Sequence, residues 1–172
     1  FGYDDVIDGK VLTVNINSVD SLSLESKNIS DLTGIADFNA LTSLDCHLNQ
    51  LSNLDVSKNI ALTSLVCWRN KLTSLDVSGC TALLHLKCEQ NRLTSLDVSK
   101  NTALTSLDCT GFFFSINKLT NLDVSQNTAL ISLRCRDNQL TKLDVSKNTA
   151  LTELSCGDNP LTNLDVSKNT AL

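Results

Sequence analysis

The segment LTSLVCWRNKLTSLDVSGCTA, residues 62–82, carries the pattern that decides the fold of this chain. The pattern L-x-x-L-x-C-x-x-N-x-L-x-x-L-D-V-S-x-N-x-A recurs in six consecutive units, which are 41–61, 62–82, 83–103, 104–129, 130–150 and 151–171. All are 21 residues long except the fourth, which has 26. Each unit consists of two similar halves, because the first half, L-x-x-L-x-C-x-x-N, has the same spacing as the second half, L-x-x-L-D-V-S-x-N. A fixed period of this length predicts a solenoid of stacked units.

The spacing within each unit predicts which side chains face the interior. In L-x-C the leucine and cysteine are two residues apart, so an extended strand points both to the same side. We expect pairs such as Leu65/Cys67 and Leu75/Val77 to be buried between stacked units, each of which adds a strand to a parallel sheet. The asparagines at the strand ends are expected to turn inward and hydrogen-bond the backbone of the next unit. They are Asn49, Asn70, Asn91, Asn117, Asn138 and Asn159.

Six of the seven cysteines occupy one phase of the repeat, and Cys80 takes the place of an asparagine. No C-x-x-C pair occurs, so zinc-finger spacing is absent. Side chains in register on adjacent parallel strands point the same way, which disfavours disulfides. We predict that all seven are reduced and buried as small apolar side chains.

Composition and motifs exclude several classes of function. The 172 residues include 14 Lys and Arg against 19 Asp and Glu, giving a net charge of −5, and nucleic-acid binding needs the opposite balance. No apolar run approaches the roughly 20 residues of a membrane span. The two histidines lie near no nucleophile motif, and phosphate-binding loops are absent. We therefore predict no enzyme, cofactor or metal site. The aspartates of the L-D-V-S segments are expected to be solvated, and four of the six are expected to be compensated by a lysine three residues on, namely Lys58, Lys100, Lys147 and Lys168.

The repeats resemble the leucine-rich repeat family, specifically its short 21-residue bacterial class with nested half-repeats. Residues 28–32, NISDL, resemble the internalin-like variety. The resemblance covers residues 19–172 and rests on the family motif L-x-x-L-x-L-x-x-N/C-x-L. It implies an α/β-type leucine-rich repeat solenoid, here almost all β, that is right-handed, with a parallel sheet on the concave face and an extended convex side. It also implies binding of a protein or glycan on that face, and a secreted or surface location in a bacterium.

The N-terminal part follows the pattern less closely. Residues 19–40 are predicted to form an irregular repeat, and residues 1–18 the remnant of an N-terminal cap, with 11–16 as a strand against the first unit. Leu172 begins a further unit without a polar cap, so more sequence is expected to follow.

The repeats differ from one another mainly at the outward positions of the L-x-C half, while the L-D-V-S half barely changes. Uniform positions repeat a packing solution, whereas varied ones are either shaped for a partner or drifting neutrally. Trp and Arg are enriched in binding hot spots. The predicted partner-binding residues on this face are Trp68, Arg69, His85, Lys87, Glu89, Asp108, Arg134 and Arg136.

The fourth unit has five extra residues between Cys109 and Asn117. The insertion is expected to bulge from the rim, with Gly111 permitting the departure, and to leave the stack intact. We add Phe112, Phe113 and Phe114 to the predicted binding surface, although the loop could instead bury them against the coils. The predicted function is a non-catalytic secreted or cell-surface binding module. The alternatives are a structural or self-assembling solenoid, serving as a spacer or filament, and an ancillary domain of a larger secreted enzyme.

Overall fold

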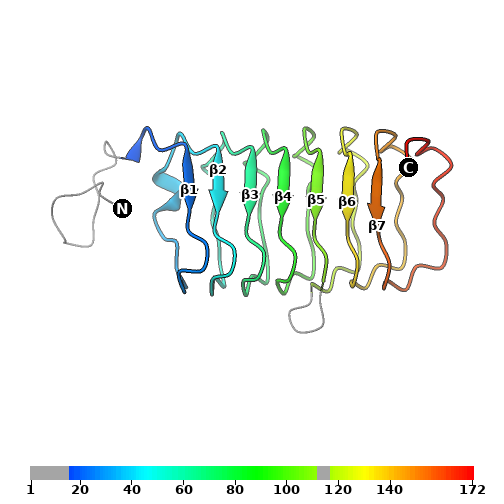
Figure 1. Cartoon of the computed structure of the whole chain (residues 1–172), viewed down its shortest axis with the longest axis horizontal. Helices are drawn as coiled ribbons and strands as arrows, with labels where there is room; N and C mark the ends of the chain where they lie inside the picture. Colours follow the sequence, from blue (N-terminus) through cyan, green and yellow to red (C-terminus); the bar gives the residue numbers. More distant parts are fainter. Residues whose placement is uncertain (1–15, 112–116) are drawn as a thin grey trace.

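A single parallel β-sheet of seven strands runs along the described part of the chain (Figure 1). The computed structural model describes residues 16–111 and 117–172. Its strands pair in sequence order, from β1 to β7, so each coil contacts only the coils before and after it. They are β1 (Ser21–Ser23), β2 (Ser43–Asp45), β3 (Ser64–Val66), β4 (His85–Lys87), β5 (Ser106–Asp108), β6 (Ser132–Arg134) and β7 (Glu153–Ser155). The predicted leucine-rich repeat solenoid is confirmed.

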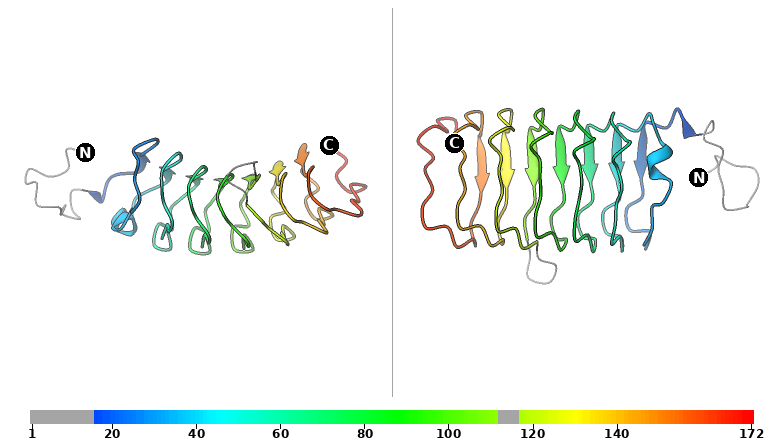
Figure 2. Two further views of the ribbon diagram at one scale, coloured as in Figure 1. Left: turned by 90° about the horizontal axis from the view of Figure 1, so that it is seen from below. Right: turned by 180° about the vertical axis from the view of Figure 1, so that it is seen from behind.

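The L-D-V-S segments form the face opposite the sheet. Seen from below, the coils lie side by side with the strands on one face and extended chain on the other (Figure 2). One short 3-10 helix, η1 (Ile35–Asp37), stands on this back face in the first coil. Asp55 and Asp76 form an isolated parallel bridge there. The back is therefore extended and almost free of helix within the described ranges, as the repeat length predicts.

The core is a stack of leucines, valines and cysteines in register. The central leucine of each strand pairs with the central leucine of the next, as Leu86 does with Leu107. From coil 41–61 to coil 130–150, these leucines, the cysteines after them and the back-face Leu/Val pairs are all buried. The predicted inward phase is confirmed for these coils.

The last coil is less well covered. Leu154, Cys156 and Leu164 are only partly buried, and Val166 is 40% exposed. This coil packs against a neighbour on one side only within the described chain. The prediction that all seven cysteines are buried is therefore wrong for Cys156, while the other six are buried.

Asparagine side chains join each coil to the one before it. Asn70 donates from Nδ2 to the carbonyls of Cys46 and Cys67, at 3.0 and 3.1 Å, and its Oδ1 accepts from the Leu51 N–H at 3.0 Å. The same ladder includes Asn49, Asn91, Asn117, Asn138 and Asn159. A second row on the back uses Asn59, Asn101, Asn127, Asn148 and Asn169. In that row Cys80 donates its thiol to the Val56 carbonyl at 3.4 Å. The predicted inward turn of the asparagines is confirmed, but their inter-coil partners lie on the preceding coil and not on the next one.

The insertion leaves the stack continuous, as predicted. Asn117 keeps its place in the ladder, donating to the carbonyls of Cys88 and Cys109. Gly111 is needed for a reason other than the one predicted. It does not adopt a left-handed conformation, but a Cβ atom there would lie 1.9 Å from the Asp137 carbonyl oxygen. Glycine thus permits close approach of the next coil. Phe112, Phe113 and Phe114 lie outside the described residues.

Burial is expected to make the thiols of the six buried cysteines unreactive in the folded state. It raises the pKa of Cys46 and Cys135 to about 12, and the pKa values of Cys67, Cys88 and Cys109 well above the usual range. Because the thiolate is the reactive form, we expect a thiol reagent at pH 8 to label at most Cys156 in the native protein. After denaturation seven thiols should react. Rapid labelling of several thiols in the native protein, or disulfides detected by mass spectrometry, would contradict this expectation.

Candidate binding surface

The varied positions of the repeat come together on one surface, which we call the sheet face. Its outward residues form three rows along the solenoid, set by the strand register and by the main-chain hydrogen bonds that follow each strand. The row before the buried leucines is Ser21, Ser43, Ser64, His85, Ser106, Ser132 and Glu153. The row after them is Ser23, Asp45, Val66, Lys87, Asp108, Arg134 and Ser155. The third row is Glu25, His47, Trp68, Glu89, Thr110, Arg136 and Gly157.

An aromatic cluster occupies the N-terminal part of the third row. The His47 imidazole stacks on the Trp68 indole, with the ring centroids 4.3 Å apart and the planes at 13°. The Arg69 guanidinium carbon lies 5.6 Å from the Trp68 ring centroid, and Arg69 Nε donates to Gln90 Oε1 at 2.5 Å. Trp68 is half-buried and held by neighbours on two coils. This arrangement presents a rigid aromatic edge to solvent.

The conformation of Arg69 was not expected from the sequence. Arg69 has φ = 51°, in the left-handed region, and Leu48, Gln90, Asp137 and Asp158 at the equivalent positions have φ between 53° and 56°. In each of these coils the chain makes the same tight turn shortly after the strand. The residue types give only a partial signal of it. Aspartate, which stands at positions 137 and 158, is enriched at left-handed φ, whereas Leu48, Arg69 and Gln90 are not of types that favour it.

Glu89 carries the most perturbed carboxyl group of the sheet face. Its Oε2 atom is buried without a hydrogen-bond partner. Desolvation, followed by repulsion from the Asp108 carboxylate, raises the pKa of Glu89 to about 7, although Lys87 acts in the opposite direction. At neutral pH the surface beside Trp68 therefore changes charge.

Replacing Glu89 with glutamine is expected to stabilise the protein at alkaline pH. A raised pKa in the folded state means that the stability present below about pH 4.5 is lost as the pH rises through about 7. The Glu89→Gln variant should be more stable at pH 8 by about 1–3 kcal/mol, after allowance for solvent screening of a partly exposed group. Urea unfolding at pH 6 and pH 8 measures this. The matched variant Glu153→Gln should show no such difference between these pH values, and an equal stability profile for all three proteins would contradict the expectation.

The two arginines near the C-terminal end are engaged in ion pairs. Arg134 Nη2 lies 2.6 Å from Glu153 Oε1, and Arg136 Nη2 lies 2.6 Å from Asp158 Oδ2. The hydrogen bond from Arg134 lowers the pKa of Glu153, after a larger effect of Ser132. Exposed pairs of this kind contribute about 1 kcal/mol or less, so a partner can displace them at small cost.

Eight of the eleven predicted binding residues lie together on the sheet face or its rim. His85 and Lys87 are exposed on β4, and Asp108 is half-buried on β5, where its Oδ1 accepts from the Thr110 N–H at 3.1 Å. The remaining three are the phenylalanines outside the described residues. Sequence reasoning did not include His47, Asp45 and Glu25 among the binding residues. The contacts of His47 with Glu25 and Trp68 form only between coils, and the repeat pattern gave no signal of the Asp45–His47 contact within one coil.

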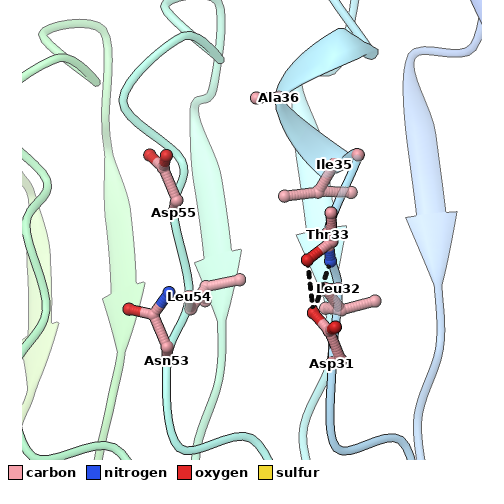
Figure 3. Close-up of a pocket in the computed structure, with 9 residues that line it drawn as sticks. Asp31, Leu32, Thr33, Ile35, Ala36, Asn53, Leu54 and Asp55 are labelled. Atoms are coloured by element: carbon pink, nitrogen blue, oxygen red, sulfur yellow. Dashed lines mark hydrogen bonds between the residues drawn. The ribbon is translucent and has the colours of Figure 1, made fainter.

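A small hollow opens on the opposite face, beside η1 (Figure 3). Its volume is about 200 Å³, and it is lined by Asp31, Leu32, Thr33, Gly34, Ile35, Ala36, Asn53, Leu54 and Asp55. The Asp31 carboxylate accepts from both the Thr33 N–H and the Thr33 hydroxyl, at 2.8 and 2.7 Å. The Asp31 side chain is thus already hydrogen-bonded within the first coil. The hollow also lies away from the positions that vary between repeats.

The aspartates of the back face act as turn residues. In each L-D-V-S segment, Oδ1 accepts the N–H of the serine two residues on, at 2.8–3.0 Å. These hydrogen bonds are the main reason why the pKa of each aspartate is lowered, as for Asp97. The lysines that follow lower the pKa further where present, but none forms an ion pair in the described part of the chain. The hydrogen bond from serine to aspartate within each L-D-V-S segment thus explains why these residues are the same in every repeat.

Comparison with known proteins supports the same fold. No protein-family model matches the chain, and a search of curated proteins finds no match. Among solved structures, the functional domain of InlJ from Listeria monocytogenes, which includes a cysteine ladder, is 36% identical with a TM-score of 0.54, over 93% of this chain and 44% of that one. The chain thus spans less than half of the InlJ structure.

Two further structures from the same organism share the fold alone. Internalin C2 is 18% identical with a TM-score of 0.66, over 94% of this chain and 82% of that one. The internalin InlF is 19% identical with a TM-score of 0.51, over 94% of this chain and 68% of that one. Across residues 16–111 and 117–172, no helix is long and apolar enough to span a membrane.

The cysteine row gives the most specific link between sequence, structure and comparison. Cysteine stands at an inward leucine position of the motif in six consecutive repeats. The InlJ structure, which includes a cysteine ladder, is 36% identical to this chain over the matched region. With its nested 21-residue coils and its parallel sheet, this chain forms a leucine-rich repeat solenoid that is similar to those of the Listeria internalins.

Proposed function

We propose that this chain is a non-catalytic binding module, secreted or displayed on a bacterial surface, that recognises a protein through the sheet face. One observation carries the proposal: the side chains that differ between repeats lie on one exposed surface, while the back face repeats the same residues. Packing and turn formation explain the constant residues. Neither explains why Val66, Lys87 and Asp108 differ at the equivalent position of neighbouring strands.

The aromatic cluster is suited to recognition. Binding costs free energy when side chains must be ordered, and prior ordering reduces that cost. Trp68 is already held between coils by the His47 stack and by Arg69. Around it lie charges of both signs, including Asp45, Lys87 and Glu89. A rigid aromatic residue with a mixed polar surround is typical of a protein interface.

The buried thiols are compatible with an oxidising exterior. Disulfide chemistry requires a thiolate, and burial raises the pKa of the ladder cysteines far above neutral pH. A reducing compartment is therefore not needed to keep them free. The internalin-like structures support the same location.

The test compares variants of the two faces. The immobilised chain is screened against arrays of candidate proteins and glycans, and hits are quantified by biolayer interferometry. Trp68→Ala should weaken a specific hit at least about tenfold, as truncation of a hot-spot residue does. The back-face variant Ser95→Ala should bind like wild type. An equal loss of affinity in both variants would contradict the proposal. A specific glycan hit would show that the partner is a glycan and not a protein. Particles that grow with protein concentration in light scattering would favour self-assembly.

The Phe-rich loop is proposed as a second part of the binding surface. Deleting residues 112–116 leaves Cys109-Thr110-Gly111-Asn117, which restores the 21-residue spacing. The deletion should keep the fold, because Gly111 and Asn117 already hold their coil positions. Thermal melting checks the fold, and the same binding assay checks the function. A folded deletion variant with unchanged binding would remove the loop from the proposal.

A further inference from the structure

We propose that the sheet face carries a site for a divalent transition-metal ion, formed by Glu25, Asp45 and His47. In this site the ion binds His47 Nε2 and the Glu25 carboxylate, while Asp45 orients the imidazole. One ligand atom from each of the three residues lies within 4.8 Å of the others. The residues come from two neighbouring coils, just after or within β1 and β2 (Ser43–Asp45).

Asp45 defines which ring nitrogen is available. Its Oδ1 lies 2.5 Å from His47 Nδ1 and also accepts the His47 backbone N–H at 3.2 Å. A carboxylate placed at Nδ1 holds the proton there, which leaves the lone pair of Nε2 free for a metal. A carboxylate hydrogen-bonded to the far nitrogen of a metal-binding histidine is a recurring arrangement that fixes the orientation of the ring.

The distance on the other side of the ring fits an ion better than a direct hydrogen bond. His47 Nε2 lies 3.4 Å from Glu25 Oε2, whereas a charge-assisted hydrogen bond between such atoms is about 2.7–2.9 Å long. Two ligand atoms at about 2.0–2.1 Å from a tetrahedral zinc ion are about 3.3–3.4 Å apart. The observed separation therefore matches the edge of a tetrahedral site without movement of either side chain.

Trp68 restricts the motion of the His47 ring, and the types of the ligand atoms determine which ions the site prefers. Trp68 stacks on the imidazole at 4.3 Å, so the ring cannot rotate freely. One nitrogen and one carboxylate ligand favour Zn²⁺, Cu²⁺ or Ni²⁺ over Ca²⁺ and Mg²⁺, which prefer oxygen ligands alone. Two protein ligands leave coordination positions for water, so binding is weaker than at a closed structural zinc site.

The chain contains its own reporter and its own control. Trp68 is the only tryptophan and lies against His47, so a paramagnetic ion at Nε2 should quench its fluorescence. His85 is the only other histidine and stands exposed on β4. Ni²⁺ is titrated into the full chain, and Zn²⁺ is titrated separately by isothermal titration calorimetry. We expect saturable quenching that Zn²⁺ reverses, and one Zn²⁺ bound per chain.

The variants decide the assignment. His47→Ala should abolish saturable binding in calorimetry, Glu25→Gln should weaken it at least about tenfold, and His85→Ala should leave it unchanged. Asp45→Asn should weaken binding, because the imidazole loses the carboxylate that orients it. Circular dichroism checks that each variant is folded. Zn²⁺ binding that is absent in wild type, unaltered in His47→Ala, or lost equally in His85→Ala would overturn the proposal.

Discussion

Replacing Leu107 with alanine is expected to lower the free energy of unfolding by about 2–5 kcal/mol. Leu107 lies at the centre of β5, fully buried, in register with Leu86 and Leu133 on the two neighbouring strands. Truncation removes apolar contacts on both sides and leaves a cavity that extended backbone cannot close. A solenoid is stabilised by the interfaces between neighbouring coils, so weakening a central coil affects coils on both sides.

Urea unfolding followed by circular dichroism measures the loss for Leu107→Ala. The matched control is Leu84→Ala, two residues before the centre of β4, where the leucine side chain is exposed. That variant should stay within about 0.5 kcal/mol of wild type. If Leu107→Ala melts within a degree of wild type, Leu107 is not interior and the inward phase is wrong.

Replacing Asn91 with alanine is expected to cost about 2–4 kcal/mol. It leaves the buried Leu72 N–H without a partner, and it removes one of the two asparagine donors to each of the Cys67 and Cys88 carbonyls, which keep Asn70 and Asn117. Asn91 is fully buried, and its Nδ2 donates to the carbonyls of Cys67 and Cys88 at 3.0 and 3.1 Å. Its Oδ1 accepts the Leu72 N–H at 3.1 Å. Water has no access to these groups, so the loss is not compensated by solvation.

Two comparisons isolate this effect. Asn121→Ala removes an exposed asparagine from the back face and should change stability by no more than about 0.5 kcal/mol. Hydrogen exchange of the Leu72 amide should accelerate in Asn91→Ala and stay slow in Asn121→Ala. Equal unfolding midpoints for the two variants would show that the asparagine ladder does not support the coils.

The sequence predicted the face on which the residues of the candidate site lie. It did not predict which of their side chains are in contact. Placing Trp68, Glu89 and Arg134 on one face required only the repeat length, because identical spacing puts equivalent residues in register. The His47–Trp68 stack and the Arg134–Glu153 pair depend on which rotamers neighbouring coils allow. A periodic pattern contains no information about those choices, so the group formed by Glu25, Asp45 and His47 was missed.

The sequence by itself determined the repeat, the inward leucines and cysteines, the asparagine ladder and the continuity of the stack at Asn117. Each of these follows from spacing along one chain and from the need to bury apolar groups and pair the backbone. Only the tertiary structure decided the features that depend on how coils approach one another. These are the left-handed turn at Arg69, the close approach that requires Gly111, the partial exposure of Cys156 and the orphaned carboxylate oxygen of Glu89. The physical reason is that solvent access and close contact at a residue are set by its neighbours on the adjoining coils, which lie about 21 residues away along the chain.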